Sequence, residues 1–296
     1  MTDIPRRTFL KACAAAAAVP ALRSLDVQAG AAAEGPVAFG RPVGLQLYSL
    51  RQYLPKDVPG TLAKIRSMGF REVEGGSTYD LGLGAFRDAV AKAGLRVTSE
   101  HHAYEQWRDD SASVLKQATG LGARYVGCPW IPHGDRFTRE DCLQAAANFN
   151  KWGKAAKDAG LRFFYHTHGY EFVESAEGTL LDTLLKETDP ALVSLEADVF
   201  WVKRGGGDPV ALFQRYPGRI PLTHLKDMVK GLETNQPTGK APEDADVALG
   251  TGQIDFVALL RAANQGGVEM HFLEDESSKA LVQIPESLRY LAGLSS

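Results

Sequence analysis

Cysteine is scarce in this sequence, and its distribution limits the kinds of site that can be expected. The 296 residues include three cysteines, Cys13, Cys128 and Cys142, and no Cys-x-x-Cys pair. A cysteine-based zinc or redox site is therefore not expected. Cys128 ends an apolar segment and Cys142 lies in a helical pattern, so we expect two buried free thiols. A disulfide between them is the alternative that an oxidising compartment would permit.

The sequence also lacks an excess of basic residues and long apolar runs. Lys and Arg together number 33 and Asp and Glu 36, which gives a formal net charge of −3. Without a basic stripe, no nucleic-acid partner is expected. No apolar run of about 18 residues follows the N-terminal segment, so no membrane span is expected once that segment is removed.

The first 33 residues differ from the rest of the chain. "RRTFLK" (6–11) precedes an Ala-rich apolar stretch, and small residues follow near Ala31 and Ala33, where cleavage is expected. The pattern is similar to a twin-arginine export signal, although Pro5 stands where such signals usually have Ser or Thr. It predicts export by the Tat machinery to the periplasm or beyond. An Ala-rich disordered tail and an uncleaved surface helix are the alternatives.

The remaining chain alternates short apolar segments with amphipathic segments. Eight such pairs fill about 250 residues. The expected strands are 43–50, 70–76, 95–102, 123–130, 161–168, 191–198, 220–227 and 268–275; the expected helices are 60–69, 84–94, 111–122, 139–160, 178–188, 208–218, 254–267 and 279–291. Helices between strands imply parallel pairing, and eight units close a barrel. We predict one α/β domain over 40–296, a (β/α)8 TIM barrel, with 228–252 as the main insertion. The competing open, doubly wound sheet lacks its Gly-x-Gly-x-x-Gly fingerprint.

Histidines and carboxylates collect at the predicted strand ends. The chain has seven histidines, and five of them lie at the ends of the third, fifth and seventh strands: His101, His102, His166, His168 and His224. Carboxylates end three strands in the same way, and Glu100 lies near the end of the third strand: Glu74 on the second, Glu196 with Asp198 on the sixth, and Glu274 on the eighth. The carboxyl ends of barrel strands form the active-site face of this fold.

Strand alternation indicates which of these side chains share the barrel interior. His166 and His168 share a face, as do Glu196 and Asp198, and as do His224 and Lys226. Glu274 continues the face of Met270 and Phe272, whereas His271 falls on the opposite face and is interpreted as structural. One His or carboxylate from each of four successive strands predicts a divalent metal site for Mn²⁺, Fe²⁺, Co²⁺ or Zn²⁺. A rim of solvated polar residues is the alternative.

The segments "YHTHGYEF", "LEADVFW", "LTHLKD", "GTGQIDF" and "FLEDE" resemble the sugar phosphate isomerase/epimerase family of xylose isomerase-like barrels. The resemblance implies one divalent ion, most often Mn²⁺, with Mg²⁺ also compatible. It implies four metal ligands: His166, Asp198, His224 and Glu274. The better-known members have Glu at the end of strand five, where this chain has His166, and Glu171 is the rival for that place.

The same resemblance suggests roles for the neighbouring side chains. Candidates for proton transfer or oxyanion stabilisation are Glu274, Glu171, His168 and Lys226, although Lys226 pairing with Asp227 is an equal alternative. Candidates for contact with substrate are Glu74, His101, His102, Trp201 and Arg204. Trp201 is equally well interpreted as a lid over the barrel. The glycine-rich "KRGGG" (203–207) is expected to be a loop.

The expected chemistry is removal of the proton next to a sugar carbonyl, with stabilisation of the enediolate by the metal charge. Export and the lack of a phosphate cradle favour a non-phosphorylated sugar or keto-sugar. Isomerisation or epimerisation is the first prediction. A lyase that cleaves 3-keto-glycosides is the alternative, and an exported sugar-binding barrel without catalysis is the second. The oligomeric state is open, a homo-oligomer included.

Overall fold

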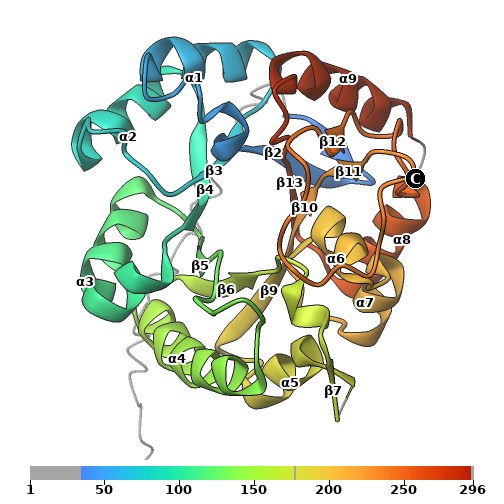
Figure 1. Ribbon diagram of the computed structural model, residues 1–296. Coiled ribbons are helices and arrows are strands. Elements are labelled where there is room, and N and C mark those ends of the chain that lie inside the picture. Colours follow the sequence, from blue (N-terminus) through green and yellow to red (C-terminus); the bar gives the residue numbers. More distant parts are fainter. Residues whose placement is uncertain (1–34, 177, 295–296) are drawn as a thin grey trace, which may run out of the picture. The chain divides into compact units, whose positions relative to one another are not determined.

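Eight parallel strands close into a barrel in the computed structural model, which describes residues 35–176 and 178–294 (Figure 1). The strands are β2 (Arg41–Gln46), β3 (Glu72–Gly75), β4 (Arg96–His101), β5 (Tyr125–Cys128), β6 (Arg162–His166), β9 (Val193–Asp198), β10 (Leu222–Leu225) and β13 (Met270–Leu273). Parallel pairing of β13 with β2, and of β2 with β3, completes the closure. The predicted single-domain TIM barrel is thus confirmed. The predicted signal, residues 1–33, lies outside the described residues.

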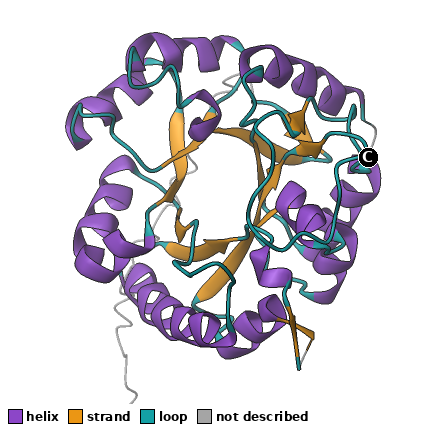
Figure 2. Ribbon diagram, viewed as in Figure 1, coloured by secondary structure: helices purple, strands orange, loops and turns teal. Residues whose placement is uncertain are grey.

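The helices lie outside the barrel strands (Figure 2). They are α1 (Val58–Ser67), α2 (Leu83–Lys92), α3 (Tyr104–Leu121), α4 (Arg139–Asp158), α5 (Leu180–Glu187), α6 (Val199–Gly205), α7 (Pro209–Arg215), α8 (Phe256–Gly266) and α9 (Ala280–Gly293). Local signals explain several boundaries. Thr138 and Thr179 begin α4 and α5 with capping boxes, and Gly267 ends α8 in the left-handed conformation. None of the described helices is long and apolar enough to cross a membrane.

Two local predictions were wrong. Residues 203–205, expected as the start of a loop, belong to α6, because the Asp198 side chain caps this helix by accepting from the Trp201 amide at 3.0 Å. Seven residues are too few to show a helical period in the sequence. The first strand ends at Gln46, four residues early, and the chain turns into the 3₁₀ helix η1 (Leu47–Leu50). This turn brings Tyr48 and Arg51 to the barrel mouth.

The insertion after β10 is anchored by one buried carboxylate. Short strands β11 (Asp227–Met228) and β12 (Asp246–Val247) pair within it, as β1 (Val37–Ala38) pairs with β2 and β7 (Glu174–Ser175) with β8 (Gly178–Thr179). Asp227 accepts hydrogen bonds from the amides of Met228, Gly250, Gly252 and Ile254. Its carboxylate is therefore satisfied by backbone, and no ion pair joins it to Lys226, which was one of the two alternatives for that lysine.

Large side chains fill the barrel interior beneath the polar residues at the carboxyl ends of the strands. Five buried residues form this layer: Tyr125, Phe164, Leu222, Met270 and Phe272. Glycine faces the rings where space is short, because a Cβ on Gly44 would lie 2.7 Å from Phe272 and one on Gly127 2.5 Å from Phe164. His271 points outward and shares a 2.6 Å hydrogen bond with Thr223. Cys128 and Cys142 are free and buried, as expected.

The glycine–phenylalanine contact predicts a stability effect. Gly127→Ala should lower the free energy of unfolding by about 1–3 kcal/mol, because the packed Phe164 ring must shift to admit the methyl group. Gly84→Ala is the control: no atom lies within 4 Å of its added Cβ, and alanine should stabilise helix α2 by about 0.5–1 kcal/mol. Urea unfolding of both variants tests this. Equal stability of Gly127→Ala and the wild type would contradict the packing described.

Candidate functional site

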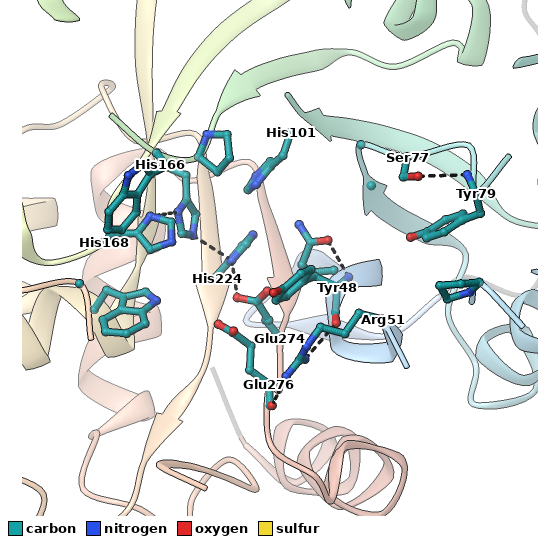
Figure 3. Close-up of a pocket in the computed structure, with 18 residues that line it drawn as sticks. Tyr48, Arg51, Ser77, Tyr79, His101, His166, His168, His224, Glu274 and Glu276 are labelled. Carbon is teal, nitrogen blue, oxygen red and sulfur yellow. Dashed lines mark hydrogen bonds and ion pairs between the residues drawn. The ribbon is translucent and has the colours of Figure 1, made fainter. Parts of the chain in front are cut away.

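Four polar side chains converge at the carboxyl ends of β6, β9, β10 and β13. They are His166, Asp198, His224 and Glu274, the four predicted metal ligands, and one ligand atom from each lies within 4.8 Å of the others. His166 Nε2 lies 3.1 Å from His224 Nδ1, which in turn lies 3.0 Å from Glu274 Oε2. Figure 3 shows this convergence of His166, His224 and Glu274. We call these four residues the tetrad.

The tetrad fits a divalent cation. Asp198 Oδ2 is buried and has no hydrogen-bond partner among the described residues, although His166 Nε2 lies 3.7 Å away. Burial lowers the pKa of His166 well below its ordinary value, so its imidazole is neutral, the form that binds metals. Two imidazole nitrogens and two carboxylates suit Zn²⁺ and the other first-row divalent ions. The donor set does not distinguish among them.

His166, and not Glu171, occupies the strand-five position of the tetrad. The buried Glu171 carboxylate accepts hydrogen bonds from the Tyr165 hydroxyl and from the His168 amide, the latter at 2.9 Å. Burial raises the pKa of Glu171 to about 7. Glu171 is directed toward the loop that it stabilises and does not line the cavity, so the structure does not place it where a base would contact substrate.

A cavity of about 680 Å³ opens above the tetrad. It is lined by six of the predicted site residues: His101, His166, His168, Trp201, His224 and Glu274. Sequence reasoning missed nine other lining side chains: Gln46, Tyr48, Arg51, Pro55, Ser77, Tyr79, Pro129, Trp130 and Glu276. Most of these lie on loops, where no periodicity indicates direction. Their positions near the carboxyl ends of predicted strands, or shortly after them, were the available signal, since this end forms the active-site face of a barrel.

Glu74 lies below the cavity rather than in it. Its Oε1 is 2.6 Å from His224 Nε2 and accepts from Gln46 Nε2 at 2.8 Å. His101 Nε2 lies between two carboxylates, 3.2 Å from Glu74 and 2.7 Å from Glu196. Glu74, His101, Glu196 and His224 form a second group that could hold a cation. However, the 2.6 Å contact is explained by His224 Nε2–H donating to Glu74, which leaves Nδ1 as the nitrogen directed toward the tetrad.

His102 and Arg204 lie away from the cavity lining. Strand alternation directs His101 inward and His102 outward, where its Nε2 lies 3.3 Å from the buried Glu100 carboxylate. The Arg204 guanidinium donates to the backbone carbonyls of Glu233 and Lys240 and so holds the insertion after β10. The structure therefore brings neither side chain to a position of substrate contact.

Lys226 is a buried counter-charge behind the tetrad. Its Nζ pairs with Glu276 and lies 3.5 Å from Glu274, 3.6 Å from Asp246 and 3.9 Å from Asp198. Although burial opposes the charge, these carboxylates raise the pKa of Lys226 well above its usual value. The ammonium group is thus available to compensate the ligand carboxylates, but it does not line the cavity.

The contrast between His166 and Glu171 predicts different effects on metal binding. His166→Ala should weaken Mn²⁺ binding by about 100-fold or more, because it removes a nitrogen donor of the tetrad. Glu171→Gln should leave the affinity unchanged. Calorimetric titration of each variant with Mn²⁺ measures both. Loss of binding in Glu171→Gln alone would show that the loop carboxylate is the ligand.

The Glu74 contact generates a separate prediction. Glu74→Gln should weaken Mn²⁺ binding by about 10–100-fold, because an amide no longer fixes the His224 tautomer. Glu72→Gln on the same strand is the control, since Glu72 bonds Arg96 and Thr98 instead. Wild-type affinity in Glu74→Gln, measured by the same titration, would contradict a role in orienting His224.

Comparison with known proteins agrees with this architecture. A model of the xylose isomerase-like TIM barrel family matches residues 62–294. Inosose dehydratase from Clostridium tetani is 37% identical over 92 residues, 31% of this chain and 30% of that enzyme. Inosose dehydratase from Clostridium beijerinckii is 26% identical over 243 residues, 73% of this chain and 81% of that enzyme. A solved sugar phosphate isomerase/epimerase from Parabacteroides distasonis superposes with a TM-score of 0.70 at 25% identity, covering 86% of this chain and 99% of that one. The chain belongs to the xylose isomerase-like TIM barrel family.

Proposed function

We propose that this protein is a metal-dependent enzyme that removes the proton next to the carbonyl of a non-phosphorylated sugar. The observation that supports it is the tetrad at the base of a 680 Å³ cavity on the active-site face of the barrel. A divalent cation held there would polarise the carbonyl and stabilise the negative charge that develops on proton removal. Arg51 is the only Lys or Arg among the residues that line the cavity, which favours an uncharged sugar over a sugar phosphate.

Two side chains of the cavity are suited to act on the substrate. Glu274 is a carboxylate beside the reaction space and is the proposed base. His168 Nδ1 lies 3.2 Å from His166 Nδ1. If His166 directs the Nε2 lone pair into the tetrad, its Nδ1–H donates to His168 Nδ1. His168 then carries its proton on Nε2 and is the proposed hydrogen-bond donor to the departing oxygen.

Elimination is the reaction that this arrangement favours. Glu274 takes the proton from the carbon next to the carbonyl, a carbon–carbon double bond forms, and the bond from the β-carbon to its oxygen substituent breaks. The carboxylic acid formed on Glu274 returns its proton to the departing oxygen while His168 Nε2–H donates a hydrogen bond to that oxygen, so charge and protons balance. The curated relatives reported above are named dehydratases, and loss of water is an elimination of this kind. Isomerisation or epimerisation, in which the proton returns to the sugar, is the second candidate and is supported by the isomerase/epimerase name of the structural neighbour.

The exported location is also a proposal. It rests on residues 1–33, which lie outside the described part of the chain, and on the twin-arginine pattern of "RRTFLK". A free sugar or glycoside is the kind of substrate that an enzyme outside the cytoplasm would encounter.

The proposed reaction predicts metal-dependent exchange. Protein loaded with Mn²⁺ in D₂O should exchange the proton next to the carbonyl of a 3-keto-glycoside or an inosose and release the β-substituent, both followed by NMR. Asp198→Asn should lose both activities by at least 100-fold, since it removes a tetrad carboxylate. Exchange without release would establish isomerase or epimerase chemistry instead. Binding without exchange would overturn the enzyme proposal and leave a sugar-binding barrel.

A further inference from the structure

The cavity has two chemically different ends. Its inner end is polar and contains the tetrad residues His166, His224 and Glu274. Its outer end is walled mainly by aromatic and proline side chains: Tyr48, Pro55, Tyr79, Pro129, Trp130 and Trp201. The charged Arg51 and Glu276 lie beside Tyr48 (Figure 3). Figure 3 shows Tyr48 and Tyr79 across the cavity from His166 and His168. Trp130 and Trp201 are on the histidine side, with ring centres 5.2 and 5.8 Å from that of His168.

Two of these rings are unusually exposed for their size. Six large apolar side chains are exposed in the described part of the chain, and two of the six line this cavity: Tyr48, 53% exposed, and Trp130, 36% exposed. Exposed aromatic rings that line one cavity mark a surface that is completed by a ligand. A single sugar ring at the tetrad would leave the Tyr48 and Trp130 rings uncovered, because the cavity of about 680 Å³ is larger than one hexose. Its volume falls within the range of roughly 300–1,000 Å³ that is typical of pockets for larger ligands.

The aromatic walls are also held in place before any ligand arrives. Trp130 stacks on His133 at 5.0 Å and meets the edge of Tyr170 at 4.7 Å. The Tyr170 hydroxyl accepts from the Ile131 amide at 2.8 Å, which fixes the loop that carries Trp130. The insertion after β10 also reaches this wall, since a Cβ on Gly239 would lie 2.9 Å from the Trp130 ring.

The opposite wall is fixed by its own contacts. The Arg51 guanidinium lies 4.7 Å from the Tyr48 ring centre and donates to the carbonyl oxygen of Glu276 at 2.7 Å. Tyr79 adopts a left-handed backbone with φ of 50°, which is rare for a residue other than glycine. Such strain is retained at sites where the direction of a side chain matters. Rings that are already ordered lose little entropy when a ligand stacks on them.

We propose that the outer end of the cavity is a subsite for the leaving group, and that this group is a ring with an apolar face. An aryl group and a second sugar ring share this chemistry, since both present a flat or C–H-rich face to aromatic side chains. The substrate class is therefore a glycoside whose sugar lies at the tetrad and whose second ring lies between Tyr48 and Trp130. This inference rests on the proposed elimination, because the ring is the group that departs.

Calorimetric binding tests the subsite without requiring turnover. The probes are D-glucose, 4-nitrophenyl β-D-glucoside and a β-linked glucose disaccharide, each titrated into Mn²⁺-loaded protein. At least one two-ring probe should bind about tenfold more tightly than glucose. Trp130→Ala should reduce this preference about tenfold, and Trp130→Phe should retain most of it. Tyr53→Ala is the control, because Tyr53 is 41% exposed but does not line the cavity.

Each outcome of the titrations decides the proposal. Preference for the nitrophenyl probe identifies an aryl subsite, and preference for the disaccharide identifies a sugar subsite. Equal binding of all three probes, or an equal loss in Trp130→Ala and Tyr53→Ala, would overturn the subsite. A preference that depends on Trp130 in a protein without exchange activity would leave the subsite standing and contradict the proposed function alone.

Discussion

The burial of several carboxylates close together, at the carboxyl ends of the barrel strands, is the constraint on which the rest of the site depends. Asp198, Glu274, Glu74 and Glu196 are buried at the end of an apolar barrel, where uncompensated carboxylates are very costly. Lys226 offsets part of this charge from behind, and His101 lies between two of the carboxylates. Asp198 Oδ2 accepts no hydrogen bond from the described residues. A cation held by the tetrad would offset more of this negative charge.

The layers of the barrel interior follow from the same constraint. Rings such as Phe164 and Phe272 close the lower part of the interior against Gly44 and Gly127. Polar side chains are confined to the upper end, where the tetrad is supported by the Glu74–His224 contact. Loops then add the aromatic walls that decide what can lie above the tetrad. Chemistry and selectivity thus come from different parts of the chain, the strand ends and the loops.

Much of this arrangement can be predicted from sequence, and the reasons are physical. All eight strands and the convergence of His166, Asp198, His224 and Glu274 follow from apolar segments and from alternation along each strand. Alternation also placed His271 outside the barrel. It could not reveal that Glu74 lies below the cavity or that Arg204 holds a loop, because depth and loop contacts depend on tertiary packing. Helix α6 and the cavity-lining Tyr48, Tyr79 and Trp130 were missed for a different reason. They lie in short or aperiodic segments, whose sequence does not indicate where a side chain points.

The central claim is that the tetrad, and not the group below it, holds the catalytic cation. Anomalous diffraction from crystals grown with Mn²⁺ tests this most directly. We predict one peak within coordination distance of His166 Nε2, Asp198 Oδ2, His224 Nδ1 and the Glu274 carboxylate. A peak among Glu74, His101 and Glu196, or no peak in Mn²⁺-saturated crystals, would contradict the account.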